Sequence, residues 1–261
     1  MTRALSAWAA GVLLFLHLPM LILAVFSFNA SKFTVWEGFS LHWYAAALRD
    51  AQLAESAANS LFIAAAATLI ATTVGTLAAY GLWKQARGPI ASALNGTFYL
   101  SLVTPEIVLG IALLAFYQWI FRFLDIRLGM HTVILAHVMF SVAYVVIVVT
   151  ARLRALDPTL EEAALDLGAT EWTAFREVTL PQLMPGIIAA ALLAFTLSID
   201  DYVITSFVAG VDSETLPMVI YAMARRGGNP VVNAISTAIV FALGILILLA
   251  ERLQTAGRPA K

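Results

Sequence analysis

Charged residues are scarce in this chain: they make up 12% of its 261 residues, whereas 61% are apolar. Soluble domains contain about 25% charged residues, so the composition predicts a membrane protein. Cysteine is absent, which excludes disulfide bonds, thiolate metal sites and cysteine nucleophiles. The formal net charge of −1 does not indicate a basic surface of the kind that binds nucleic acid. We therefore predict no nucleic-acid partner.

Long stretches without any charged residue define the expected membrane segments. A helix needs about 20 apolar residues to cross the hydrocarbon core of a bilayer, and five stretches without Asp, Glu, Lys or Arg are at least that long. A sixth stretch is interrupted only by Glu106. We expect an all-α membrane protein that forms one domain over residues 1–261. Its six transmembrane helices are expected near residues 8–28, 60–83, 97–119, 131–150, 187–209 and 232–250.

The distribution of basic residues predicts the orientation. Nine of the 15 Lys and Arg residues lie at the termini and in the even-numbered loops, and six lie in the odd-numbered loops. Basic residues concentrate on the cytoplasmic side, so both termini are expected in the cytoplasm. The first apolar stretch is longer than the roughly 7–15 residues of a signal-peptide core, and we expect it to be retained. Arg225 and Arg226, in the last outer loop, are expected to contact lipid headgroups, with a docking protein as the alternative.

One cytoplasmic loop, residues 151–186 between the fourth and fifth spans, is long and patterned. Asp157-Pro158 favours a helix start, because Asp caps free N–H groups and Pro is tolerated in the first turn. Gly168 favours the end of that helix. A second short helix is expected over residues 170–178, and we expect Pro181 to stop it.

Apolar residues recur at helical spacing in the first of these short helices and form a stripe along it. The stripe consists of Leu160, Ala163, Ala164 and Leu167. An apolar stripe is normally buried against other apolar groups, and two alternatives are open for this one: it packs on its own helix bundle, or it enters a cleft in another protein.

The same loop resembles the EAA motif of bacterial ABC-importer permeases, which reads Glu-Ala-Ala, three residues, Gly, nine residues, Ile, any residue, Leu-Pro. The matching residues are Glu162, Ala163, Ala164, Gly168, Leu180 and Pro181, with Val178 in place of the usual Ile. The resemblance implies the architecture of a type I ABC importer permease. It also implies that the short helix docks into a groove on an ATP-hydrolysing subunit and transmits the closure of that subunit.

Further segments are similar to the spermidine/putrescine permeases of the PotC and PotI type, among them SFNASKF at 27–33, TPEIVLGIALL at 104–114 and FTLSIDDYVITSFVAG at 195–210. This resemblance implies a polyamine importer in the bacterial inner membrane. The implied partners are a second, PotB- or PotH-like permease, two cytoplasmic ATP-binding subunits that hold ATP and Mg, and a periplasmic substrate-binding protein.

Three carboxylates, Glu106, Asp200 and Asp201, lie within the expected spans, whereas no Lys or Arg does. A charged side chain inside a bilayer costs at least about 2.5–3.5 kcal/mol and normally faces a wet cavity or a partner. Acids without a basic partner favour a path for a cation, and Glu106 and Asp200 are placed to line one cavity. We expect one of the two adjacent aspartates to face the pathway and the other to accept hydrogen bonds from Thr205.

Each of these residues also has a structural interpretation. Glu106 could be a buried, protonated acid, and the two aspartates could form a helix-packing network. The resemblance assigns Trp43 to substrate passage together with Glu106 and Asp200, and we add Asp201 to these pathway residues. An interfacial anchor is an equally open interpretation of Trp43. His17 and His137 also lie in spans, and we expect them to be packing residues.

Motifs for catalysis are missing as well. A Walker A loop needs Gly before a Lys that is followed by Ser or Thr, and none of the three lysines, Lys32, Lys84 and Lys261, follows Gly. No nucleophile elbow or His/carboxylate cluster with metal-ligand spacing is present. We therefore expect a non-catalytic transport subunit without a cofactor of its own. An ABC permease for another cationic or amino-bearing solute and a cation-coupled secondary transporter are the alternatives.

Overall fold

The computed structural model describes residues 2–33, 35–85, 88–124, 126–227 and 229–256. Arg87, Arg258 and Lys261, which contribute to the predicted orientation, lie outside them. These ranges are helical and contain no strand, only one isolated bridge between Asn29 and Phe39. Contacts divide them into two compact units, one within residues 1–56 and 219–249 and the other within 57–218 and 250–261. The single domain over 1–261 stays a prediction.

The first unit contains, wholly or in large part, α1 (Thr2–Phe26), α2 (His42–Arg49), α11 (Leu216–Arg226) and α12 (Val231–Ala256). The second contains most of α3 (Ala51–Gln85), then α4 (Pro89–Val103), α5 (Glu106–Leu124), α6 (Met130–Leu153), α7 (Thr159–Asp166), α8 (Glu171–Ala174), the π-helical segment η1 (Phe175–Thr179), α9 (Leu180–Ile199) and α10 (Val203–Val208).

Four helical segments of the described chain are long and apolar enough to span a membrane, and a bent pair of helices makes a fifth candidate. The four are Leu5–Phe26, Ala51–Lys84, Met130–Leu153 and Glu171–Ile199. At the position of the sixth expected span lies α12, whose apolar part, Val231–Ile245, is shorter. The structure is therefore that of a multi-pass helical membrane protein.

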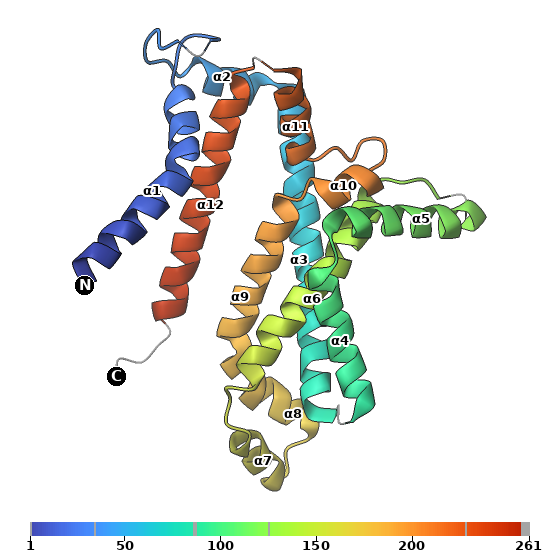
Figure 1. Cartoon of the computed structure of the whole chain (residues 1–261). Coiled ribbons are helices and arrows are strands. Elements are labelled where there is room, and N and C mark those ends of the chain that lie inside the picture. Colours follow the sequence, from blue (N-terminus) through green and yellow to red (C-terminus); the bar gives the residue numbers. More distant parts are fainter. Residues whose placement is uncertain (1, 34, 86–87, 125, 228, 257–261) are drawn as a thin grey trace. The chain divides into compact units, whose positions relative to one another are not determined.

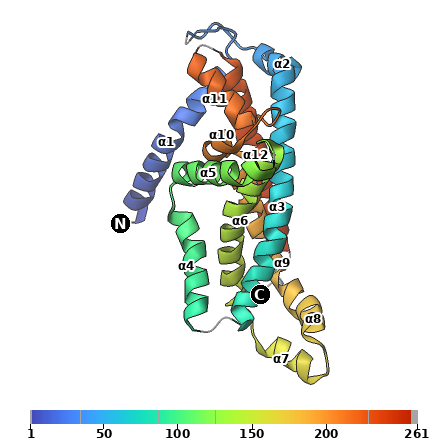
Figure 2. The same cartoon turned by 90° about the vertical axis from the view of Figure 1, so that its right-hand side faces the viewer.

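The third expected span, 97–119, is not one helix. The chain bends by 109° between α4 and α5, and Figure 2 shows α5 running across the end of α4. Pro105 causes the bend, because it lacks an N–H group and disfavours helical backbone in the residue before it. Accordingly, Thr104 is extended, with φ −66° and ψ 126°. This bend places Glu106 in the first turn of α5 instead of the middle of a span.

The fifth expected span, 187–209, differs at both ends. Helical structure continues from Glu171 to Ile199, so the prediction that Pro181 stops a second short helix was wrong. The π-helical turn directly before this proline explains the difference, since the Leu180 N–H bonds to the Phe175 carbonyl five residues back. This wider turn accommodates a residue that has no N–H to donate.

Within the second unit, α6 is the central helix and packs against α9, α4 and α10. Figure 1 shows α6 and α9 side by side, with α7 and α8 at one end of this bundle and α10 at the other. Small residues permit the close crossings. A Cβ atom at Gly75 of α3 would lie 2.6 Å from Cγ1 of Val145, and one at Gly186 of α9 would lie 2.8 Å from Cγ of Arg152.

Candidate functional site

A cleft of about 370 Å³ opens in the second unit where α4, α5, α6, α9 and α10 meet. Two of the acids expected in the membrane, Glu106 and Asp200, line it together. Its other lining residues are Asp201, Ser101, Leu102, Thr104, Leu109, Phe140, Tyr144, Leu197, Tyr202, Val203 and Ile204. None of these described lining residues is basic, so the cleft has an excess of acidic groups.

The end of α9 determines how the two adjacent aspartates are placed. Residues 200–202 separate α9 from α10, and Asp200 is the C-cap residue of α9. The depth and angle expected from one continuous helix therefore do not apply. Asp200 is exposed to the cleft, whereas the Asp201 side chain is only 6% exposed.

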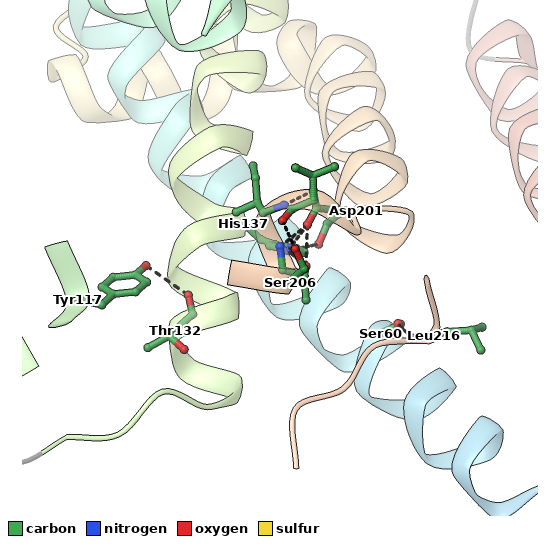
Figure 3. A network of polar contacts seen from close by, with 11 residues as sticks. Ser60, Tyr117, Thr132, His137, Asp201, Ser206 and Leu216 are labelled. Atoms are coloured by element: carbon green, nitrogen blue, oxygen red, sulfur yellow. Dashed lines mark hydrogen bonds and ion pairs between the residues drawn. The ribbon is translucent and has the colours of Figure 1, made fainter. Parts of the chain in front are cut away.

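Asp201 is held by the start of α10 (Figure 3). Its Oδ2 atom accepts hydrogen bonds from the backbone N–H of Thr205 (2.8 Å) and from the Thr205 hydroxyl (2.6 Å). Its Oδ1 atom accepts a bond from the N–H of Ile204 (3.3 Å). Asp201 thus caps α10 in the way expected for one of the two aspartates, and Asp200 is the one left to face the cleft.

His137 of α6 completes this network and is fully buried. The Thr205 hydroxyl proton goes to the Asp201 carboxylate, which can only accept. The Thr205 oxygen therefore accepts from Nε2 of His137, at 2.9 Å. Nδ1 of His137 lies 2.6 Å from the Ser198 hydroxyl, which donates to it when the imidazole is neutral. His137 is thus a packing residue as expected, and it links α6, α9 and α10.

Further contacts fix α10 and the loop that follows it. The Thr132 hydroxyl donates to the Val208 carbonyl (2.6 Å), and the Ser60 hydroxyl of α3 accepts from the N–H of Leu216 (2.8 Å). A Cβ atom at Gly210 would lie 1.8 Å from the Leu128 carbonyl oxygen. The short helix α10, which contributes Val203 and Ile204 to the cleft lining, is therefore held by hydrogen bonds at both of its ends.

Trp43 belongs to α2 of the first unit and is not one of the residues that line the cleft. It is 8% exposed, and its indole N–H donates to the Asn29 carbonyl (2.8 Å). Asn29 in turn donates to the Val35 carbonyl and accepts from the N–H of Glu37. Trp43 therefore stabilises the loop between α1 and α2 through its bond to Asn29. Its part in substrate passage stays a prediction.

The loop between α6 and α9 forms the expected capped helix, α7. Asp157 accepts hydrogen bonds from the N–H and the hydroxyl of Thr159, and these bonds lower the pKa of Asp157. At the other end Gly168 has φ +91°, a conformation that glycine adopts without steric cost. It allows the N–H of Ala169 to bond back to the Ala164 carbonyl (3.0 Å).

The predicted apolar stripe of α7 is mostly uncovered in the described chain. Leu160 is 48% exposed and Leu167 is 89% exposed, while Ala163 is exposed and Ala164 is half-buried. The alternative in which the bundle covers this stripe is therefore wrong for most of its residues. The face that packs inward is a different one, centred on Glu161.

Glu161 is the site residue that the sequence did not reveal. It is 5% exposed, and its carboxylate lies 2.7 Å from Nζ of Lys84. It also accepts from the hydroxyls of Tyr80 (2.7 Å) and Thr179 (2.6 Å). The only signal in the sequence is that Glu161 directly precedes the EAA motif, and its basic partner is too distant along the chain to identify.

Residues 71–260 match the family described as binding-protein-dependent transport system inner membrane component. The chain belongs to this family. It is a permease subunit of an ABC transporter, and the predicted family resemblance is confirmed. The motif residues Glu162, Ala163 and Ala164 lie on α7, with Gly168 just after it and Leu180 and Pro181 at the start of α9.

Two curated relatives cover most of the permease. It is 44% identical over 248 residues to the putrescine transport system permease protein PotI of Escherichia coli (strain K12). This match covers 92% of this chain and 88% of PotI. It is 38% identical over 251 residues to the spermidine/putrescine transport system permease protein PotC of the same strain. This match covers 95% of this chain and 92% of PotC.

The fold is also that of a solved ABC permease. A bacterial ABC transporter involved in the import of the acidic polysaccharide alginate contains a chain similar to this permease, with a TM-score of 0.78. The two are 16% identical, and the match covers 99% of this chain and 96% of the other. At this identity the similarity establishes the fold alone.

Proposed function

We propose that the permease translocates polyamines, such as putrescine or spermidine, across the bacterial inner membrane. The observation that carries this proposal is the cleft that Glu106 and Asp200 share without a basic lining residue. Carboxylates attract ammonium groups, and aromatic rings cover the methylene chain between them. Phe140, Tyr144 and Tyr202 supply such rings in the same cleft. The names of PotI and PotC support this substrate class.

The proposed assembly contains a second, PotB- or PotH-like permease, two cytoplasmic ATP-binding subunits and a periplasmic substrate-binding protein. ATP and Mg belong to the ATP-binding subunits. The uncovered apolar stripe of α7 supports this arrangement, because it offers a docking surface for one of them. ATP binding closes the two ATPases, α7 moves with them and the bundle opens outward, and hydrolysis resets it.

Six spans with both termini in the cytoplasm complete the proposal. This topology requires the bent pair α4–α5 and the shorter apolar helix α12 each to act as a span. It places α7 on the cytoplasmic side and Arg225 and Arg226, at the end of α11, on the outer side near lipid headgroups.

Purification of the complex from its native membrane tests the proposal. The permease should be recovered with an ATP-binding subunit and with a binding protein that holds a polyamine, which mass spectrometry identifies. A binding protein that holds another cationic or amino-bearing solute would favour an ABC permease for that solute. Cation-gradient-driven uptake without any ATPase would favour a secondary transporter and contradict the proposal.

A further inference from the structure

Glu161 connects three elements at the cytoplasmic end of the bundle. It belongs to α7, Lys84 and Tyr80 belong to the last turns of α3, and Thr179 ends η1. Its Oε1 atom lies 2.7 Å from both the Lys84 ammonium and the Tyr80 hydroxyl, and its Oε2 atom accepts the Thr179 hydroxyl at 2.6 Å. Both carboxylate oxygens therefore have donors.

The surroundings of Glu161 strengthen these bonds. The ring of Tyr80 packs on that of Phe175, with 4.4 Å between centroids, and Phe175 belongs to a buried apolar cluster with Leu153 and Leu183. Burial alone would raise the pKa of Glu161, but the bonds from Lys84, Thr179 and Tyr80 hold that pKa below its usual value. Glu161 is thus an ionised group in an apolar setting, where charge-assisted hydrogen bonds are strong.

The two faces of α7 differ in what they contact. The face with Leu160, Ala163 and Leu167 is exposed, whereas Glu161 points to the bundle. Directly after Thr179, η1 continues into α9, which ends at the acidic cleft, and α3 is one unbroken helix from Ala51 to Gln85. One carboxylate therefore links α7 both to α3 and to η1, which leads into α9.

We propose that Glu161 is a positioning residue that tethers α7 to α3 and η1, so that movement imposed on the exposed face of α7 reaches the membrane helices. This inference rests on the proposed function, because it needs an ATPase that moves α7. It concerns the contact between α7 and its own bundle, which is distinct from the contact between the EAA motif and a partner.

The test uses the whole complex in proteoliposomes and measures substrate uptake and ATP hydrolysis in the same sample. Glu161→Gln and Lys84→Met should each leave hydrolysis within about two-fold of the unmodified rate and lower uptake per ATP by at least about ten-fold. If the two residues act as one pair, the double variant should be no worse than the more severe single variant. Glu177→Gln, an exposed carboxylate on η1 with the same change of charge, is the matched control.

A milder variant covers the case in which Glu161→Gln does not assemble. Tyr80→Phe removes one donor to the same carboxylate and keeps the ring packed against Phe175, and it should lower uptake per ATP by about two- to five-fold. If uptake per ATP is unchanged in both Lys84→Met and Tyr80→Phe, Glu161 does not transmit the movement of α7 and the proposal is wrong. If the unmodified complex shows no link between uptake and hydrolysis, the proposed function itself fails, which is a different result.

Discussion

The two adjacent aspartates should respond differently to the same substitution. Asp200 faces the cleft and Asp201 caps α10, so Asp200→Asn should impair uptake of a cation while leaving assembly intact. Asp201→Asn should weaken the fold around α10 in addition to any effect on uptake. The comparison separates an electrostatic role from a structural one, since each change replaces one carboxylate oxygen by an NH2 group and removes the negative charge.

The expected size of the Asp200 effect follows from Coulomb's law. A carboxylate and an ammonium about 4 Å apart attract by about 4 kcal/mol at an effective dielectric constant of about 20, and by about 1 kcal/mol in water. The cleft is open to solvent, so we expect a loss of about 1–3 kcal/mol. This corresponds to about a five- to 150-fold lower transport efficiency for a polyamine.

The Asp201 effect follows from its hydrogen bonds. Its two oxygens accept from the N–H groups of Ile204 and Thr205 and from the Thr205 hydroxyl. In either orientation an asparagine amide places N–H against one of these donors. A buried donor left without an acceptor costs about 1–3 kcal/mol, so the variant should denature at a lower temperature than the unmodified complex.

The assay is uptake of labelled putrescine or spermidine by proteoliposomes, together with thermal denaturation of the purified complex. Asp212→Asn is the matched control, because Asp212 is exposed and has φ 61°, a conformation that asparagine tolerates. Undiminished uptake by Asp200→Asn, or a strong uptake defect with unchanged stability in Asp201→Asn alone, would refute the assignment.

Three further predictions concern the loop that contains α7 and the loop after α10. Deletion of residues 157–181 should uncouple ATP hydrolysis from uptake, and normal coupling in the purified deleted complex would rule out docking through α7. Gly210→Ala should reduce the yield of folded protein, measured by gel filtration in detergent, because its Cβ would meet the backbone of Leu128; a normal elution profile and yield would contradict this. The pKa of Glu161 is lowered in the folded protein, so its stabilising contribution should be complete above the pKa of a glutamate in the unfolded chain and should be lost as pH falls through the folded pKa. Thermal denaturation from pH 7 to pH 3 measures this loss, and equal acid sensitivity of Glu161→Gln would argue against it.

Charge distribution and turn chemistry made several elements predictable. Stretches without charge located the long helices, and Asp157 and Gly168 defined the ends of α7 because both act within a few residues of their own position. Pro105 disfavours one straight helix at this position, but it does not fix the size of the 109° bend, since α5 also packs against α10. The positions of helix ends were therefore predictable from nearby residues, whereas the angle between α4 and α5 was not.

The end of α9 at Ile199 is not marked by a helix-breaking residue in the sequence. Neither Pro nor Gly occurs between Ser198 and Ile204. Asp201 caps α10 locally, as the sequence suggested for one of the two aspartates, but the bonds from His137 of α6 to Ser198 and Thr205 are tertiary. The pairing of Glu161 with Lys84 was hidden for the same reason. In both cases a polar residue acts on an element that is distant in sequence.

Uptake by reconstituted vesicles tests the central claim most directly. The permease, its second permease, the ATPases and the polyamine-loaded binding protein would be placed in proteoliposomes that contain ATP and Mg, with a non-hydrolysable nucleotide as the control. We predict accumulation of labelled polyamine only with ATP and the binding protein present. Accumulation that follows a proton or sodium gradient and ignores ATP would contradict the assignment of this chain to an ATP-driven polyamine importer.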